Sequence, residues 1–441
     1  MSQPDLSHPK YRPDIDGLRA VAVLSVVIYH ASPYTLKGGF AGVDVFFVIS
    51  GFLISTIIFE NLHRASFSFG EFYARRVRRI FPALFAVLVA CYAAGWYVLL
   101  ADEFSQLGKH IVAGAGFVSN VVLWRESGYF DTIAETKPLL HLWSLGVEEQ
   151  FYIAWPLLLW VVWKRRLGFI ATALIIALAS FVMNVMNVRL HQAATFYLPM
   201  TRLWELLTGS VLAWIVLNRQ GVRLETGNRF GEWLGSLVET KTRWLDHPVV
   251  TNLMSCAGAA LLAYGFWRMN KGVAFPGKWA LLPVVGTALV MFAGPRALIN
   301  RWVLSNRVAV WFGVISYPLY LWHWPLLSFA RIVEGGTPAL NTRRLCVVAA
   351  VALAWLTYRL IERPIRFGGH SRVKVAAMAT LMTLMGAVGV GTAMVGGVLG
   401  CRRSSSRART IRARRGIWST RCARSATARR ARRSSLTATA T

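Results

Sequence analysis

Apolar runs, most of them long enough to span a membrane, recur along the chain between short basic or polar loops. A helix needs about 20 predominantly apolar residues to cross the hydrocarbon core of a bilayer, where it satisfies its own backbone hydrogen bonds. The 441 residues are 55% hydrophobic and only 16% charged, with a mean hydropathy of +0.46, which excludes a soluble globular protein. Because the runs lack the alternation typical of a membrane β-barrel, the sequence predicts an all-α polytopic integral membrane protein.

Basic residues flank these runs in an order that predicts the direction of each span. Lys10 and Arg12 precede the first run, and the positive-inside rule therefore places the N-terminus in the cytoplasm. The start carries Asp14 and Asp16 and no small-residue cleavage site, so we expect the first span to be retained. Ten spans are expected to form a compact unit, and an eleventh delivers the C-terminus outward. The expected spans are 18–32, 43–59, 80–100, 149–163, 168–186, 197–217, 249–267, 279–293, 308–331, 343–361 and 375–399.

The same pattern divides the chain into regions. Residues 101–148 are expected outside, with the short Gly-rich stretch 108–124 as a partial or re-entrant segment, and the basic stretch 218–247 as a cytoplasmic loop. The expected regions are a cytoplasmic N-terminus at 1–17, the ten-helix unit at 18–366, a linker with the eleventh span at 367–400, and a tail at 401–441.

The net charge of +29 is typical of proteins that bind nucleic acid, but its distribution indicates otherwise. Thirteen arginines and no acidic residue lie in 401–441, and the other basic residues mostly flank spans, so no nucleic-acid partner is expected. The tail has no apolar periodicity and is rich in Arg, Ala, Ser and Thr, which predicts disorder. It is either a basic arm that binds anionic lipid or glycan, or the product of out-of-frame translation of a G+C-rich gene, and we favour the second.

Two ionisable residues lie in the first apolar run, Arg19 near its inner end and His30 near its outer end. Eleven positions separate them, which corresponds to about 16 Å along a helix. Ionisable side chains at such depth are costly and usually face the protein interior or a wet cavity, so they are candidates for a functional site. From position alone it is equally open that Arg19 extends to lipid headgroups and that His30 lies in the outer interface.

Four arginines immediately precede the third expected span: Arg75, Arg76, Arg78 and Arg79. They form two overlapping R-x-x-R pairs, and residues three apart share one face of a helix. Guanidinium groups bind phosphate through two parallel hydrogen bonds, so this cytoplasmic mouth predicts a site for a nucleotide-bearing donor. Ordinary positive-inside anchoring explains the same residues.

On the outer side, the stretch HLWSLGVEEQFY at 141–152 brings His141, Glu148 and Glu149 to the expected entrance of the fourth span. Aromatic faces and carboxylates bind carbohydrate, although an interfacial aromatic belt with solvated acids explains the same residues. His323 is a further polar residue in an apolar run, more typical of packing than of catalysis. No Walker, G-x-S-x-G or zinc motif occurs, and the five cysteines lack metal-ligand spacing, so no metal is expected.

In combination these stretches resemble the acyltransferase 3 family, polytopic enzymes that O-acylate lipopolysaccharide O-antigen, peptidoglycan and other extracytoplasmic glycans. The resemblance extends from about Tyr11 to Arg366, and Arg19 and His30 have the family's spacing of ten intervening residues. The segments that carry it are YRPDIDGLRAVAVLSVVIYH, GVDVFFVISGFLIS, the R-x-x-R pairs, HLWSLGVEEQFY and ISYPLYLWHWPL.

The resemblance implies that His30 is catalytic, as general base or acyl carrier, and that Arg19 supports the donor or the site. The four arginines are then expected to hold acyl-CoA, with acetyl-CoA as the expected co-substrate and no permanently bound cofactor. The acceptor is expected to be a lipid-linked or surface glycan. The protein is expected in the bacterial inner membrane, in contact with its lipids. The expected acceptor-binding or supporting residues are Asp44, His141, Glu148, Glu149 and His323.

In many members of that family an eleventh helix leads to a periplasmic SGNH hydrolase-like domain. After Gly400 this sequence has no Gly-Asp-Ser nucleophile block and no Asp-x-x-His, so chemistry that needs such a domain is not expected of it. Two other interpretations remain open. Intramembrane His and Arg also occur in proton or substrate pathways, which would make the chain a transporter or a scaffold of polysaccharide export. A truncated and inactive acyltransferase is the other.

Overall fold

The computed structural model describes residues 11–127, 134–165, 167–220, 233, 236, 245, 247–270, 272–367 and 371–403. Every regular element within these ranges is a helix, which confirms the predicted all-α class. Six stretches of the described chain are long and apolar enough to cross a membrane, as expected of a multi-pass membrane protein. The expected cytoplasmic loop and the arginine-rich tail fall almost wholly outside the described residues.

A helix lies at each of the eleven expected spans, but the first, third and fourth begin earlier than predicted and the sixth begins later. These helices are α1 (Pro13–Ala31), α2 (Gly42–His63), α3 (Phe69–Val98), α6 (Leu142–Lys164), α7 (Phe169–Asn187), α9 (Leu203–Arg219), α11 (Pro248–Arg268), α12 (Leu281–Ala293), α13 (Arg307–Val314) with α14 (Ser316–Glu334), α15 (Leu340–Thr357) and α17 (Ser371–Arg403).

The shorter elements connect these helices. The remaining α-helices with described bounds are α4 (Ala101–Ala115), α5 (Ser119–Glu126), α8 (Gln192–Tyr197) and α16 (Arg363–Phe367). The 3₁₀ turns are Gly39–Ala41, Ala134–Thr136, Pro199–Thr201 and Gly277–Ala280, and the π-helical turns are Asn300–Leu304 and Tyr358–Glu362.

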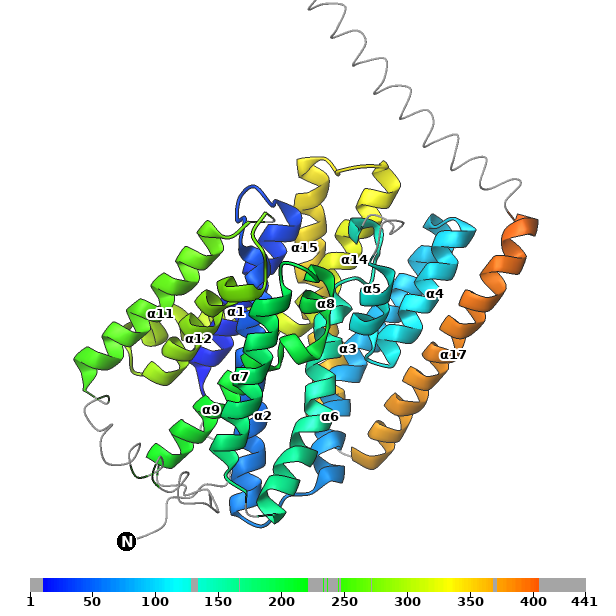
Figure 1. The fold of residues 1–441 in the computed structure, drawn as a ribbon. Coiled ribbons are helices and arrows are strands. Elements are labelled where there is room, and N and C mark those ends of the chain that lie inside the picture. Colours follow the sequence, from blue (N-terminus) through cyan, green and yellow to red (C-terminus); the bar gives the residue numbers. More distant parts are fainter. Residues whose placement is uncertain are drawn as a thin grey trace, which may run out of the picture.

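Helix α1 lies inside the bundle, where it contacts α2, α13 and α14 (Figure 1). Helices α2 and α9 approach each other backbone to backbone, because glycines occupy the crossing. A Cβ atom on Gly51 would lie 1.8 Å from the carbonyl oxygen of Leu206, and one on Gly209 would lie 2.1 Å from that of Val48. Small residues at such crossings are the usual way in which membrane helices pack closely.

The Gly-rich stretch 108–124 forms the end of α4 and most of α5, which meet at a turn where Phe117 has a φ of 54°. Helix α17 lies at the edge of the molecule beside α4 (Figure 1). There the hydroxyl of Ser105 donates a hydrogen bond to the carbonyl oxygen of Ala393 at 3.0 Å. The eleventh helix is therefore attached to the bundle through a segment that the sequence did not predict as a partner.

Candidate active site

His30, in the last turn of α1, forms a pair with His323 of α14. The Nδ1 atom of His30 lies 3.0 Å from Nε2 of His323, and the two rings are stacked with 11° between their planes. His323 is 1% exposed, and its Nδ1 atom lies 3.2 Å from the carbonyl oxygen of Leu319. The structure thus joins two histidines that are 293 positions apart in the sequence.

The carbonyl of Leu319 fixes the direction of this hydrogen-bond chain. A carbonyl oxygen only accepts, so Nδ1 of a neutral His323 carries the proton and its Nε2 atom accepts. Nδ1 of His30 is then the donor to His323, and in a neutral His30 the lone pair is on Nε2. The pair therefore orients the imidazole of His30 and selects the ring nitrogen that can act as a base or nucleophile.

Aromatic side chains and a third histidine surround the pair. The indole of Trp324 stands edge-on to His30, with 4.6 Å between ring centres, and its Nε1 atom donates to the carbonyl oxygen of Lys137 at 2.8 Å. The ring of His141 lies 5.9 Å from that of His323. The hydroxyl of Tyr320 donates to the carbonyl oxygen of His141 at 2.9 Å. His141 is thus buried beside the pair, whereas the sequence predicted it at the outer entrance of a span.

The side chains of His30, His323, His141 and Tyr320 together form a layer, which we call the histidine layer. On one side it borders an outer cavity of about 520 Å³, a size typical of small-molecule sites. His30 and Trp324 lie in its wall, next to Tyr29 and the exposed ring of Tyr34. Its charged lining residues are Lys37, Glu135, Arg331 and Arg343.

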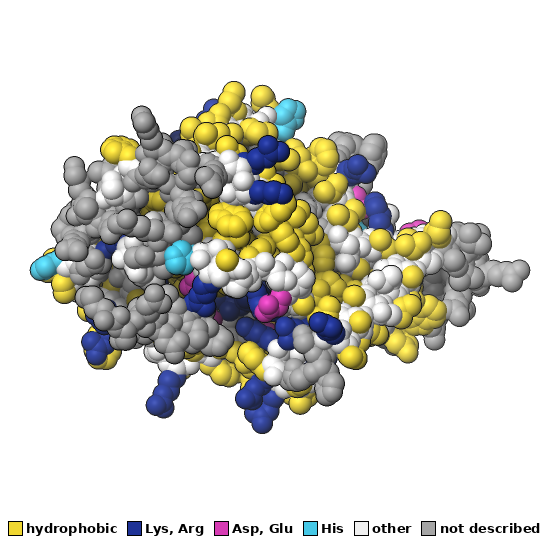
Figure 2. Space-filling view, turned by 90° about the horizontal axis from the view of Figure 1, so that it is seen from below, with side chains coloured by type: hydrophobic (Ala, Val, Ile, Leu, Met, Phe, Trp, Pro, Cys, Tyr) yellow, Lys and Arg dark blue, Asp and Glu magenta, His cyan; other side chains and the backbone are white. Residues whose placement is uncertain are grey.

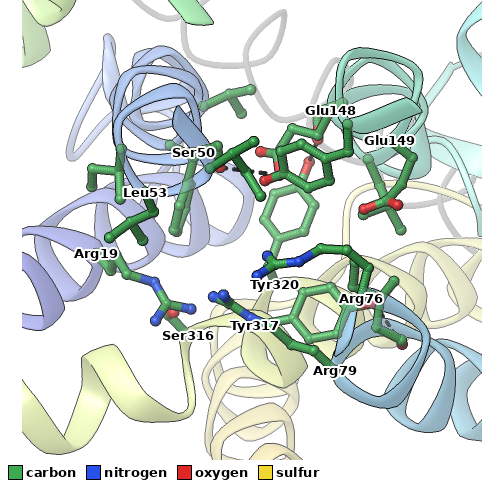
Figure 3. A pocket seen from close by; sticks show the side chains of 18 residues that line it. Arg19, Ser50, Leu53, Arg76, Arg79, Glu148, Glu149, Ser316, Tyr317 and Tyr320 are labelled. Carbon is green, nitrogen blue, oxygen red and sulfur yellow. Dashed lines mark hydrogen bonds between the residues drawn. The ribbon is translucent and has the colours of Figure 1, made fainter. Parts of the chain in front are cut away.

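On the other side lies a narrower inner cavity of about 80 Å³. The guanidinium groups of Arg19, Arg76 and Arg79 converge on it from α1 and α3 (Figure 3). The end of the molecule at which α3 begins shows Lys and Arg side chains around a hollow in its centre (Figure 2). Tyr320 lies in the wall of this inner cavity, and His30 lies in the wall of the outer one. The histidine layer therefore separates the two cavities.

The four arginines of α3 do not act as one cluster. Arg76 and Arg79 line the inner cavity, which is the i, i+3 pair predicted from the sequence. Arg75 instead forms an ion pair with Glu71, and the Nε atom of Arg78 donates to the carbonyl oxygen of Ala74 at 3.3 Å. The expectation that all four line one phosphate site is therefore wrong, because adjacent helix positions point about 100° apart.

The predicted position of Glu148 and Glu149 at the outer entrance is also wrong. Both line the inner cavity together with Arg19 (Figure 3). Glu148 accepts hydrogen bonds from the hydroxyl of Ser50 at 3.3 Å and from that of Tyr152 at 3.1 Å. The error arose because α6 begins at Leu142 rather than near 149, which carries Glu148 about 9 Å along the helix from its outer end.

Asp44 lies in neither cavity, so its expected role beside the acceptor is not supported. Its Oδ1 atom accepts from Nη2 of Arg202 at 2.9 Å, and Nη1 of Arg202 lies 3.0 Å from Glu205. All three side chains are 0% exposed. The rings of Phe47 and Trp143 cover the guanidinium at 5.3 and 5.7 Å. The sequence did not single out Arg202, although an arginine and a glutamate three positions apart in an apolar run were an available indication.

A second group of charges supports the outer edge of the site. Glu126 at the end of α5 lies within hydrogen-bond distance of Lys109, His110 and Lys137, at 2.6, 3.0 and 3.1 Å. Burial acts to raise the pKa of Glu126, but the hydrogen bonds to His110 and the two lysines hold that pKa below its usual range. Lys137 is the residue whose carbonyl accepts from Trp324, so this cluster fixes the wall beside His30.

Within the described part of the chain, no three His, Cys, Asp or Glu side chains are grouped as metal ligands. The site therefore consists of a histidine pair between a basic inner cavity and an outer cavity with aromatic walls.

Comparison with known proteins connects this geometry to a family. The acyltransferase 3 family model, described as "Acyltransferase domain", matches residues 12–359. The chain is 32% identical over 374 residues to "Putative peptidoglycan O-acetyltransferase YrhL" of Bacillus subtilis, covering 82% of this chain and 56% of the relative. It is 31% identical over 372 residues to "Peptidoglycan O-acetyltransferase OatA" of Listeria monocytogenes, with the same two coverages of 82% and 56%.

These relatives are longer than the present chain, which spans a little over half of their length. No solved structure matches it. The family match covers both cavities and the histidine pair between them, since Arg19, His30 and His323 all lie within residues 12–359. This chain belongs to the acyltransferase 3 family.

Proposed function

We propose that the protein transfers an acyl group, and specifically acetyl, from cytoplasmic acyl-CoA to a hydroxyl of an extracytoplasmic glycan. The observation that carries the proposal is the position of His30 between the two cavities. Its ring lines the outer cavity, and its partner His323 lies on the side of the inner cavity. The relatives named as peptidoglycan O-acetyltransferases support acetyl as the group and a glycan as the acceptor.

The inner cavity is suited to the donor. Coenzyme A carries phosphate groups, and three guanidinium groups line this cavity, from Arg19, Arg76 and Arg79. Guanidinium forks bind phosphate oxygens through paired, charge-assisted hydrogen bonds. With the N-terminus in the cytoplasm, as the positive-inside rule predicts, this cavity faces the compartment in which acyl-CoA is made.

The histidine pair is suited to proton transfer. Nε2 of His30 accepts the proton of the acceptor hydroxyl while the hydroxyl oxygen bonds to the thioester carbonyl carbon. The carbon–sulfur bond then breaks, and the same proton passes to the departing thiolate of coenzyme A. His323 accepts from Nδ1 of His30 throughout and so stabilises the imidazolium that forms in between. The same Nε2 atom serves the alternative course in which His30 carries the acyl group itself.

The test uses the protein reconstituted in vesicles. Radiolabelled acetyl-CoA is supplied on the side of the inner cavity, and a peptidoglycan-derived oligosaccharide is supplied as acceptor on the side of the outer cavity. We expect label on the oligosaccharide with the wild type and none above background with His30→Ala. Arg76→Ala and Arg79→Ala are expected to raise KM for acetyl-CoA about 10- to 100-fold, the usual effect of losing a charge-assisted hydrogen bond.

Arg75→Ala is the matched control, because Arg75 lies one position away and pairs with Glu71 outside the cavity. Its KM should stay within about twofold of wild type. Uptake of a solute without acyl transfer, or transfer that survives His30→Ala, would contradict the proposal.

A further inference from the structure

The outer cavity carries an excess of positive charge. Among the described residues, three basic side chains line it, from Lys37, Arg331 and Arg343, against a single carboxylate from Glu135. In the proposed orientation these residues lie on the extracytoplasmic side, where the positive-inside rule predicts few basic residues. The membrane-anchoring explanation that applies to the arginines of the cytoplasmic face therefore does not apply here.

Arg343 has hydrogen-bonding capacity that the described chain does not use. Its Nη1 atom donates to the carbonyl oxygen of Ala31 at 2.7 Å, which holds the guanidinium at the end of α1, next to His30. Its Nε atom is buried and has no hydrogen-bond partner among the described residues. A buried N–H group without an acceptor is costly, so an acceptor atom brought by a ligand would relieve this cost.

Within the part of the chain that the structure describes, Arg331 is held by long contacts alone. Its Nη1 atom lies 3.8 Å from Glu135, and its Nη2 atom lies 3.5 Å from the hydroxyl of Thr337. Both distances exceed the usual range of a charge-assisted hydrogen bond, about 2.7 to 2.9 Å. The positive charge of Arg331 is therefore poorly neutralised at the wall of the cavity.

From this charge and these unused donors we infer that the acceptor is an anionic glycan, in which a carboxylate or phosphate lies close to the hydroxyl that is acylated. Arg331 and Arg343 bind the anionic group, and Lys37 attracts it from the entrance. The aromatic faces of Tyr29, Tyr34 and Trp324 contact the sugar rings. The inference rests on the proposed function and adds the chemical class of its acceptor.

The test measures binding rather than turnover, in neutral-lipid nanodiscs, by titration calorimetry at low and high salt. The probes are maltotetraose, maltotetraose 1-phosphate and tetragalacturonate. We expect the wild type to bind one or both anionic probes at least about tenfold more tightly than neutral maltotetraose, with the preference reduced at high salt. Preference for the phosphate or for the carboxylate probe identifies which anionic group the cavity takes.

Arg331→Gln and Arg343→Gln are each expected to remove most of this preference. Arg344→Gln is the matched control, because Arg344 is the next residue along α15, is exposed and does not line the cavity. Equal binding of the three probes, binding of none of them, or a preference that survives both variants overturns the inference. Acyl transfer is assayed separately, so a failure of transfer with an intact binding preference contradicts the proposed function alone.

Discussion

One carbonyl oxygen, that of Leu319, sets the proton positions of the histidine pair. We predict that His323→Ala lowers kcat roughly 10- to 100-fold, the effect of removing one hydrogen bond to the imidazolium of His30, with little change in KM for the donor. His323→Gln should recover part of the rate, because the amide oxygen can accept from Nδ1 of His30. Steady-state kinetics on the two variants provide the measurement. Equal losses in both variants would contradict the role of His323 as hydrogen-bond acceptor for His30.

A second prediction at this scale concerns the buried charges around Arg202. We expect Arg202→Met to destabilise the protein by about 3 to 5 kcal/mol, because Asp44 and Glu205 would be left as buried carboxylates without their cation. Thermal unfolding in detergent measures the effect as a lowered Tm. Replacing Asp44 by Asn and Glu205 by Gln in the same variant should restore much of the loss. An unchanged Tm in Arg202→Met would contradict this account.

Glu126, the last residue of α5, connects this helix to α4 and to the segment that carries Lys137. The strength of this connection depends on pH. Because the pKa of Glu126 is lower in the folded protein than its ordinary value near 4.5, its charge stabilises the fold above that value. The stabilisation is lost progressively as the pH falls below about 4.5, where the unfolded chain takes up the proton first.

We therefore expect Glu126→Gln to lower stability by roughly 1.5 to 3 kcal/mol at pH 7 and by progressively less between pH 5 and pH 3. Unfolding at a series of pH values, with Asp102→Asn at an exposed position of α4 as a control, measures the difference. The groups that face Glu126 are Lys109, His110 and Lys137. A difference that grows as the pH falls would contradict the assigned direction.

The helices themselves were largely predictable, because apolar runs of spanning length have few alternatives in a bilayer. Helix ends were less so. Helix α6 begins at Leu142 and not near 149, since a polar stretch such as HLWSLG can line a protein interior as well as face water. Helix α3 likewise begins at Phe69, so the arginines lie on the helix rather than before it, and Arg76 and Arg79 reach the cavity.

At the scale of the whole molecule, the two cavities predict a fixed orientation in the membrane. In a cysteine-free background, Tyr34→Cys should react with a membrane-impermeant maleimide in intact cells, because Tyr34 is 89% exposed beside the outer cavity. Ser66→Cys, in the exposed link between α2 and α3, should react only after the cells are permeabilised. Mass-shift gels measure both reactions, and the reverse pattern would contradict the proposed orientation.

The site was predictable only in part, for a reason that belongs to this scale. Arg19 and His30 share one helix, so their separation followed from the sequence. The contact of His30 with His323, and that of Asp44 with Arg202, join residues 293 and 158 positions apart. Only packing of the whole bundle brings such residues together. His323 is more typical of packing when its own stretch is considered alone, and only this packing of the bundle places it beside His30.

The closed layer between the cavities has a consequence for the cell as well as for acyl transfer. Within the described chain the two cavities share no lining residue, and the side chains of His30, His323, His141 and Tyr320 lie between them. A passage open to both sides at once would leak protons, and each proton that crosses gives up about 2.3 kcal/mol per 100 mV of membrane potential. In the proposed mechanism the layer opens for the thioester arm of the donor, and at other times it would act as a barrier to protons in an energised membrane.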